Sequence, residues 1–255
     1  MTAAGTWVLL RGLTREAGHW GAFPDLLRAE LPANARIVAL DLPGNGRLNQ
    51  ARSPTQIEAI MQSGRQQLQA LGMPLPYHLI AMSLGAMVAV EWASQHPVEL
   101  AGCVLVNTSL RPFSPWYRRL RPRNYGTLLG VALGRWSLQA QEQAILRLTT
   151  RHPPQPDAVL ASWCALREAH PVSRGNALRQ LLAAARYRAP MTRPLVPLLV
   201  LVGGRDALVD PRCSRRLAQQ WRLPTAEHAT AGHDLPLDDG LWVARQIRRW
   251  VAGAG

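Results

Sequence analysis

The sequence predicts an α/β fold, in which a mostly parallel sheet of about six strands is covered by helices on both faces. Short apolar runs alternate along the chain with longer stretches of helical spacing. The short runs are apolar at every position, which is typical of strands buried on both faces. A chain of 255 residues with 47% hydrophobic residues is long and apolar enough for one such domain.

Six apolar runs are the predicted strands, at 7–10, 36–40, 77–81, 102–107, 198–202 and, more weakly, 225–230. The predicted helices of the core cover 22–31, 53–71, 84–96 and 241–251. Pro32 and Pro97 end two of these helices, because proline cannot continue a helix. Ser53 and Pro54 are predicted to open another, as a capping serine followed by a proline in the first turn.

Residues 111–193 interrupt this alternation with stretches of helical spacing at 125–148, 157–169 and 176–187. We therefore predict an α/β core of 1–110 and 194–255, with a helical cap inserted at 111–193. The insertion holds 14 Arg against three acidic residues, which leaves 15 Arg and 13 acidic residues for the rest of the chain. The net charge of +13 therefore belongs almost entirely to the insertion.

The composition excludes several classes of protein. No apolar run approaches the roughly 18–20 residues of a membrane span, and no signal-peptide pattern is visible. Cys103, Cys164 and Cys213 are odd in number and far apart, which argues against a disulfide framework or a zinc site. We expect a cytoplasmic protein without metal or cofactor. No nucleic-acid-binding motif accompanies the high pI, so we expect no nucleic-acid partner.

Three residues with complementary chemistry follow predicted strands. Ser83 lies in Ala81-Met82-Ser83-Leu84-Gly85, a strand-to-helix turn with small residues on both sides of the serine. Asp206 follows the fifth strand, and His233 follows the sixth behind a glycine. A serine hydroxyl becomes a useful nucleophile when an imidazole takes its proton and a carboxylate orients that imidazole. The order Ser, Asp, His at three strand ends therefore predicts a catalytic triad.

Simpler roles compete for some of these residues. Ser83 could be an ordinary helix N-cap, a role that serine often fills. Asp210 and Asp234 are alternatives to Asp206. We expect Asp210 to cap a helix before Pro211, and Asp234 to have a surface or capping role.

The chain resembles the α/β-hydrolase superfamily over nearly its whole length, in 8–12 with Trp20, 41–46, 81–85, 204–206 and 232–233. It is most similar to small capped bacterial carboxylesterases and the pimeloyl-carrier-protein methyl esterases. The resemblance implies a carboxylic-ester hydrolase that forms an acyl-enzyme on Ser83. It also implies an oxyanion hole made by the backbone N–H groups of Leu13 and Leu84. Arg11 stands where the family usually has His, and Ala81 where it usually has Gly.

Several questions stay open at this stage. A thioesterase or acyltransferase would use the same triad, and a non-catalytic ligand-binding protein would share the scaffold. His19, Trp20 and Trp116 are predicted to contact a small acyl ester substrate. The Arg-rich insertion is interpreted as a solvated face, as a surface for an acidic partner such as an acyl carrier protein, or as a site for an anionic membrane surface.

Overall fold

A computed structural model describes residues 5–134 and 136–253, and its six strands form one parallel sheet in the order β2-β1-β3-β4-β5-β6. The strands are β1 (Thr6–Leu10), β2 (Arg36–Leu40), β3 (Tyr77–Met82), β4 (Leu100–Val106), β5 (Leu198–Gly203) and β6 (Thr225–His228). The predicted fold class is confirmed. β1, β3 and β5 are buried at every position, whereas the edge strands β2 and β6 are partly exposed. The weak pattern of the sixth run therefore reflects its place at the edge.

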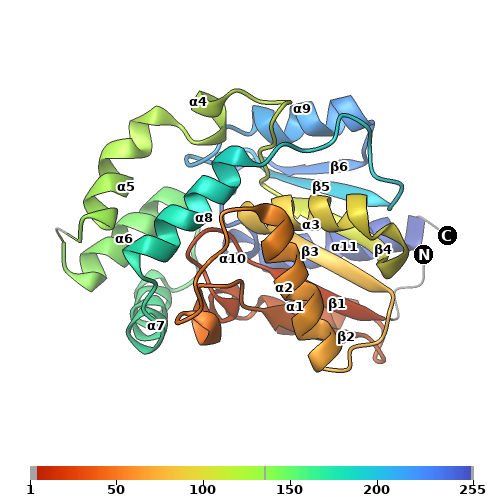
Figure 1. Cartoon of the computed structure of the whole chain (residues 1–255), viewed down its shortest axis with the longest axis horizontal. Coiled ribbons are helices and arrows are strands. Elements are labelled where there is room, and N and C mark those ends of the chain that lie inside the picture. Colours follow the sequence, from red (N-terminus) through yellow and green to blue (C-terminus); the bar gives the residue numbers. More distant parts are fainter. Residues whose placement is uncertain (1–4, 135, 254–255) are drawn as a thin grey trace.

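Helices cover both faces of the sheet (Figure 1). The core helices are α1 (Phe23–Glu30), α2 (Ile57–Ala70), α3 (Leu84–Gln95), α9 (Arg212–Trp221), α10 (Leu235–Asp238) and α11 (Gly240–Gly253). Side chains of β1 alternate between the two faces, so that Val8 packs in one core cluster and Leu9 in the other. Residues of α2, α3 and α9 complete the first cluster, and residues of α1 and α11 complete the second.

Five helices lie between β4 and β5 in the chain and pack beyond one end of the sheet, opposite the two termini (Figure 1). They are α4 (Trp116–Arg119), α5 (Tyr125–Ala132), α6 (Leu138–Thr149), α7 (Pro156–Ala169) and α8 (Arg174–Arg186). A bridge between Arg111 and Arg188 joins the two ends of this inserted segment. Short 3-10 helices complete the structure: η1 (Ala17–Trp20), η2 (Gly46–Leu48), η3 (Pro97–Glu99) and η4 (Pro122–Asn124).

Two predicted helices differ in the structure. The helix predicted from Ser53 begins only at Ile57, and the Ser53 amide instead donates to Asn176 Oδ1 of α8 at 2.9 Å. The stretch 125–148 forms two helices, and Gly134 has a φ of 63° in the turn between them. α9 was not predicted. Within the part of the chain that the structure describes, no helix is long and apolar enough to cross a membrane.

Candidate active site

Ser83 occupies a sharp turn between β3 and α3. Its φ of 56° and ψ of −113° lie outside the conformations that side-chain-bearing residues prefer, which stores about 1–3 kcal/mol of backbone strain. Gly85 permits this turn, since a Cβ there would lie 2.5 Å from the carbonyl oxygen of Leu10. The Ser83 side chain makes no capping hydrogen bond, so the interpretation as an ordinary helix cap is wrong. The hydroxyl is left available at the carboxyl end of the sheet.

His233 and Asp206 form a buried pair. His233 Nδ1 lies 2.6 Å from Asp206 Oδ2, and the two residues are 3% and 2% exposed. The other carboxylate oxygen of Asp206 accepts the backbone N–H groups of Leu208 and Val209, at 2.8 and 2.9 Å. One oxygen is therefore fixed by the loop and the other orients the imidazole, which leaves His233 Nε2 for proton transfer.

Asn107, directly after β4, holds the loop that carries His233. Its side chain donates to the carbonyl oxygens of Gly232 and His233, at 3.0 and 2.7 Å, and accepts the N–H of Gly203 at 2.7 Å. Asn107 also has a φ of 47° and is 2% exposed. The sequence analysis did not single it out, although a polar residue at a buried strand end was the available signal.

The loop after β1 lies against Ser83. A Cβ added to Gly12 would approach the Ser83 Cβ to 3.2 Å. Within the described residues the Leu13 amide donates to no acceptor, whereas the next amide, of Thr14, donates to Gln180 Oε1 of α8 at 2.9 Å. Leu84 is the first residue of α3, where helix amides lack intrahelical partners. Of the two predicted oxyanion donors, the Leu84 amide directly follows Ser83, and the Leu13 amide lies on the loop that contacts Ser83.

Arg11 and Asp234 form a buried ion pair between this loop and the residue after His233. Arg11 Nη1 and Nη2 lie 3.0 and 2.5 Å from the two carboxylate oxygens, and both side chains are 2% exposed. The Arg11 guanidinium also stacks 4.9 Å from the Trp20 ring. The predicted surface role of Asp234 is therefore wrong, and although Asp234 stands at the N-cap position of α10, its side chain makes no capping bond and instead balances the buried charge of Arg11.

A second buried ion cluster joins the inserted segment to the same loop. Glu142 of α6 has a fully buried side chain and pairs with Arg15 at 2.6 Å and with Arg167 at 2.9 Å. The Arg15 guanidinium lies 4.2 Å from the Trp163 ring and 2.8 Å from His19 Nε2. Burial, together with the charges of Arg15 and Arg11, holds the pKa of His19 well below its usual value. His19 is therefore neutral at neutral pH.

Two of the three predicted substrate contacts, His19 and Trp20, are buried, whereas the third, Trp116, is exposed. His19 is 6% exposed, and its Nδ1 accepts the backbone N–H of Glu16 at 3.2 Å. Trp20 is 3% exposed and packs on Phe23, whereas Trp116 is 67% exposed on α4. Their contact with substrate stays a prediction.

A surface hollow of about 460 Å³ is lined by residues of α6 and α7, none of which is a predicted site residue.

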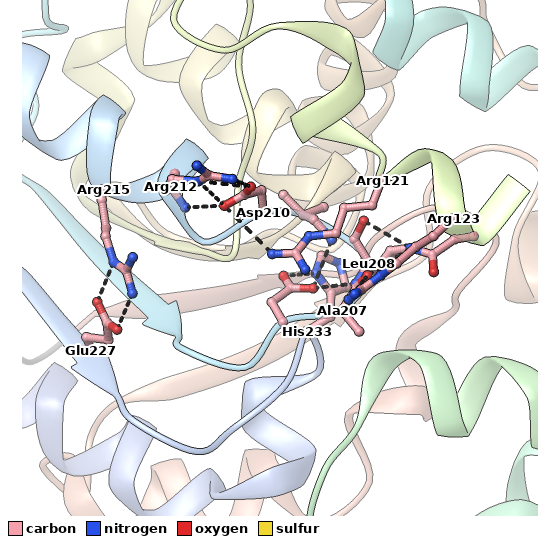
Figure 2. A network of polar contacts seen from close by, with 12 residues as sticks. Arg121, Arg123, Ala207, Leu208, Asp210, Arg212, Arg215, Glu227 and His233 are labelled. Atoms are coloured by element: carbon pink, nitrogen blue, oxygen red, sulfur yellow. Dashed lines mark hydrogen bonds and ion pairs between the residues drawn. The ribbon is translucent and has the colours of Figure 1, made fainter.

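The inserted segment also contacts the loop that follows Asp206 (Figure 2). Arg121 lies 3.7 Å from Asp210, and Arg123 donates to the carbonyl oxygen of Ala207 at 3.4 Å. Asp210 accepts the first backbone N–H of α9, from Arg212, at 3.0 Å. Asp210 lies one residue before Pro211, the N-cap position of α9, so it is not itself the predicted cap residue, although its side chain accepts this first amide. Asp206 alone of the two pairs with His233.

The fold and the strand-end site place the chain among the hydrolases of this architecture. It belongs to the alpha/beta hydrolase family, whose sequence profile matches residues 7–246.

The chain is also similar to several named proteins over most of its length. The chain is 28% identical to a "Pimeloyl-[acyl-carrier protein] methyl ester esterase" of Neisseria meningitidis serogroup C, over 78% of this chain and 77% of the relative. It is 30% identical to a "Putative carbamate hydrolase RutD" of Variovorax paradoxus, over 89% and 86% of the two chains. A solved putative lipase from Acinetobacter baumannii AYE has a TM-score of 0.78 at 20% identity, covering 99% of this chain and 85% of that one. The last likeness shows the fold alone.

Proposed function

We propose that this chain is a serine hydrolase that cleaves a carboxylic ester through an acyl-enzyme on Ser83, with His233 and Asp206 completing a catalytic triad. The observation that carries the proposal is the buried 2.6 Å contact between His233 Nδ1 and Asp206 Oδ2. It lies at the same edge of the sheet as the strained turn of Ser83. Relatives that are named as esterases support the same reaction class.

In the proposed reaction, Ser83 Oγ attacks the acyl carbon while His233 Nε2 takes the hydroxyl proton. Asp206 holds the imidazole in the required tautomer and stabilises the imidazolium. The backbone N–H groups of Leu13 and Leu84 stabilise the negative oxygen of the tetrahedral intermediate. The bond to the alcohol then breaks, and His233 returns the proton to the leaving oxygen. Water deprotonated by His233 finally attacks the acyl-enzyme and releases the acid and Ser83.

We propose a small acyl ester as substrate, with the inserted segment acting as a cap over the site. The contacts of Gln180 with the loop after β1, and of Arg123 with the loop after Asp206, support this arrangement. A methyl ester carried on an acyl carrier protein is the first specific substrate to test, because a relative is named for that activity.

The test combines covalent labelling with turnover. Wild type, Ser83→Ala and the control Ser94→Ala, whose hydroxyl bonds within α3 at 2.8 Å, would be treated with a fluorophosphonate and assayed on p-nitrophenyl esters from acetate to palmitate. We expect labelling and hydrolysis in wild type and in Ser94→Ala, and neither in Ser83→Ala. Equal labelling of Ser83→Ala would refute Ser83 as nucleophile. Faster turnover of acyl thioesters, or acyl transfer to an added alcohol, would favour a thioesterase or an acyltransferase.

A further inference from the structure

The helix α5 is apolar and yet exposed. Tyr125, Leu129 and Leu133 are spaced four residues apart and therefore share one helical face. Their exposed fractions are 39%, 58% and 46%. Trp136, 40% exposed, packs over Gly130, where an added Cβ would meet its ring at 2.8 Å. The described part of α5 carries no charged residue, whereas a surface helix normally presents a polar face to water.

The preceding helix α4 also exposes apolar side chains. Trp116 and Tyr117 are 67% and 47% exposed and contact each other edge to face, with ring centroids 5.8 Å apart. The α4–α5 surface is defined here as Trp116, Tyr117, Tyr125, Leu129, Leu133 and Trp136. In Figure 1, α4 and α5 lie at the outer edge of the inserted segment. A concentration of exposed apolar side chains of this kind marks an interaction site.

The charged residues of the chain segment that carries the α4–α5 surface are all basic, and Asp210 pairs with one of them, Arg121. From Leu100 to Gln141 the sequence contains six Arg and no Asp or Glu. The Arg118 guanidinium lies 5.9 Å from the Tyr117 ring, and Arg123 is exposed between α4 and α5. Arg174 donates to the carbonyl oxygen of Leu133 at 2.8 Å, which places another cation at the end of α5. Cations therefore flank the exposed aromatic and leucine side chains.

We propose that the α4–α5 surface binds the surface of an anionic lipid bilayer. Leucine side chains and the rings of Trp and Tyr partition into the interfacial region of a membrane, and flanking arginines bind anionic headgroups. With eight residues, α5 is far too short to span a bilayer but long enough to lie in its plane. An acidic protein partner would also pair with the arginines, and the vesicle and carrier-protein measurements described below distinguish it from a bilayer.

Sedimentation of the full chain with phospholipid vesicles tests this proposal without any substrate, so its result is independent of the proposed esterase reaction. Vesicles of phosphatidylcholine alone would be compared with vesicles containing 30% phosphatidylglycerol, at low and high salt. We expect binding to the anionic vesicles at least about tenfold tighter than to the neutral ones, and weaker at high salt. Equal affinity for both vesicles, or no binding to either, would overturn the proposal.

Two pairs of variants separate the apolar and ionic contributions. Leu129→Ser with Leu133→Ser should weaken anionic-vesicle binding about tenfold or more, because buried methylene groups are lost from the bilayer. The control pair is Val98→Ser with Leu195→Ser, both 90% exposed at the opposite, amino end of the sheet. Equal losses in the two pairs would overturn the proposal.

Arg118→Gln with Arg123→Gln should weaken binding about 25-fold at low salt, since each Arg near an anionic surface contributes about fivefold. The matched control is Arg245→Gln with Arg248→Gln, on α11. Circular dichroism would establish that every variant is folded. A dimer that Leu129→Ser with Leu133→Ser dissociates, without vesicle binding, would show that a second copy covers the surface. Salt-sensitive binding to an acidic carrier protein without vesicle binding would equally refute the membrane proposal.

Discussion

Replacing Asp234 by Asn would leave the Arg11 guanidinium charged and buried without its counter-charge. The pair is bidentate and its two side chains are each 2% exposed, so water cannot replace the lost carboxylate charge. Breaking a buried ion pair from one side costs about 3–5 kcal/mol of unfolding free energy. Domains are stable by only about 5–15 kcal/mol, so a large share of the total stability would be lost.

Urea denaturation followed by tryptophan fluorescence measures this loss. We expect a lower midpoint with an unchanged dependence on urea, and a Tm lowered by about 6–20 °C. The control is Asp25→Asn, which breaks the Arg28–Asp25 pair whose side chains are 56% and 81% exposed. That exposed pair contributes about 0–1 kcal/mol, so the control should be close to wild type.

A double variant, Arg11→Leu with Asp234→Leu, should be more stable than Asp234→Asn, because it leaves no buried charge unpaired. The reasoning would be refuted if the free energy of unfolding of Asp234→Asn stayed within about 1 kcal/mol of wild type. It would also be refuted if the double variant were destabilised by the sum of the losses of the two single variants.

Three further predictions follow from single residues. Asn107→Ala should lower kcat on p-nitrophenyl esters by about 10–100-fold with little change in KM, because the loop of His233 loses two hydrogen bonds; an unchanged kcat would contradict this. Gly85→Ala should lower the free energy of unfolding by about 2–5 kcal/mol, measured as a lower urea midpoint, since its Cβ would clash with the backbone oxygen of Leu10 at 2.5 Å. Burial lowers the pKa of His78 from 6.5 to about 4 in the folded state. Above pH 6.5 the ring is neutral in both the folded and the unfolded state, whereas below pH 6.5 the unfolded state binds the proton first and is favoured. Stability should fall by on the order of 3 kcal/mol as the pH drops from 6.5 through 4, and His78→Phe, which keeps the stacking on Trp7, should flatten this part of a denaturation–pH profile.

The parts of the fold that sequence reasoning predicted are those encoded by local pattern. β1, β3 and β5 are apolar at every position because both faces of the sheet are covered, and that pattern is readable in five or six residues. The turn at Gly134 and the late start of α2 were missed. Gly134 lies in an otherwise continuous helical pattern, and the residues before Ile57 are held by Asn176 of a distant helix, which accepts the Ser53 amide and which no local pattern reveals.

In the candidate site, too, some residues could be predicted from local sequence and others could not. Ser83, Asp206 and His233 could be singled out because each residue follows a strand and has a known chemical role. The Arg11–Asp234 pair could not, because its members are 223 positions apart and nothing local marks them as partners. Glu142 likewise looked like one acid in an Arg-rich segment, whereas the structure buries it between Arg15 and Arg167.

The burial of Glu142 also limits how the inserted segment can move. A hinge motion that lifted α6 away from the loop after β1 would separate Glu142 from Arg15 and expose the Glu142 carboxylate, whose side chain is fully buried in the structure. Such an opening is costly, since both partners would lose their charge-assisted hydrogen bonds together. Gln180 of α8, which binds the Thr14 amide, resists the same displacement. For the proposed reaction at Ser83, we therefore expect substrate to enter through small local movements next to α6 and α8, and not through displacement of the whole inserted segment.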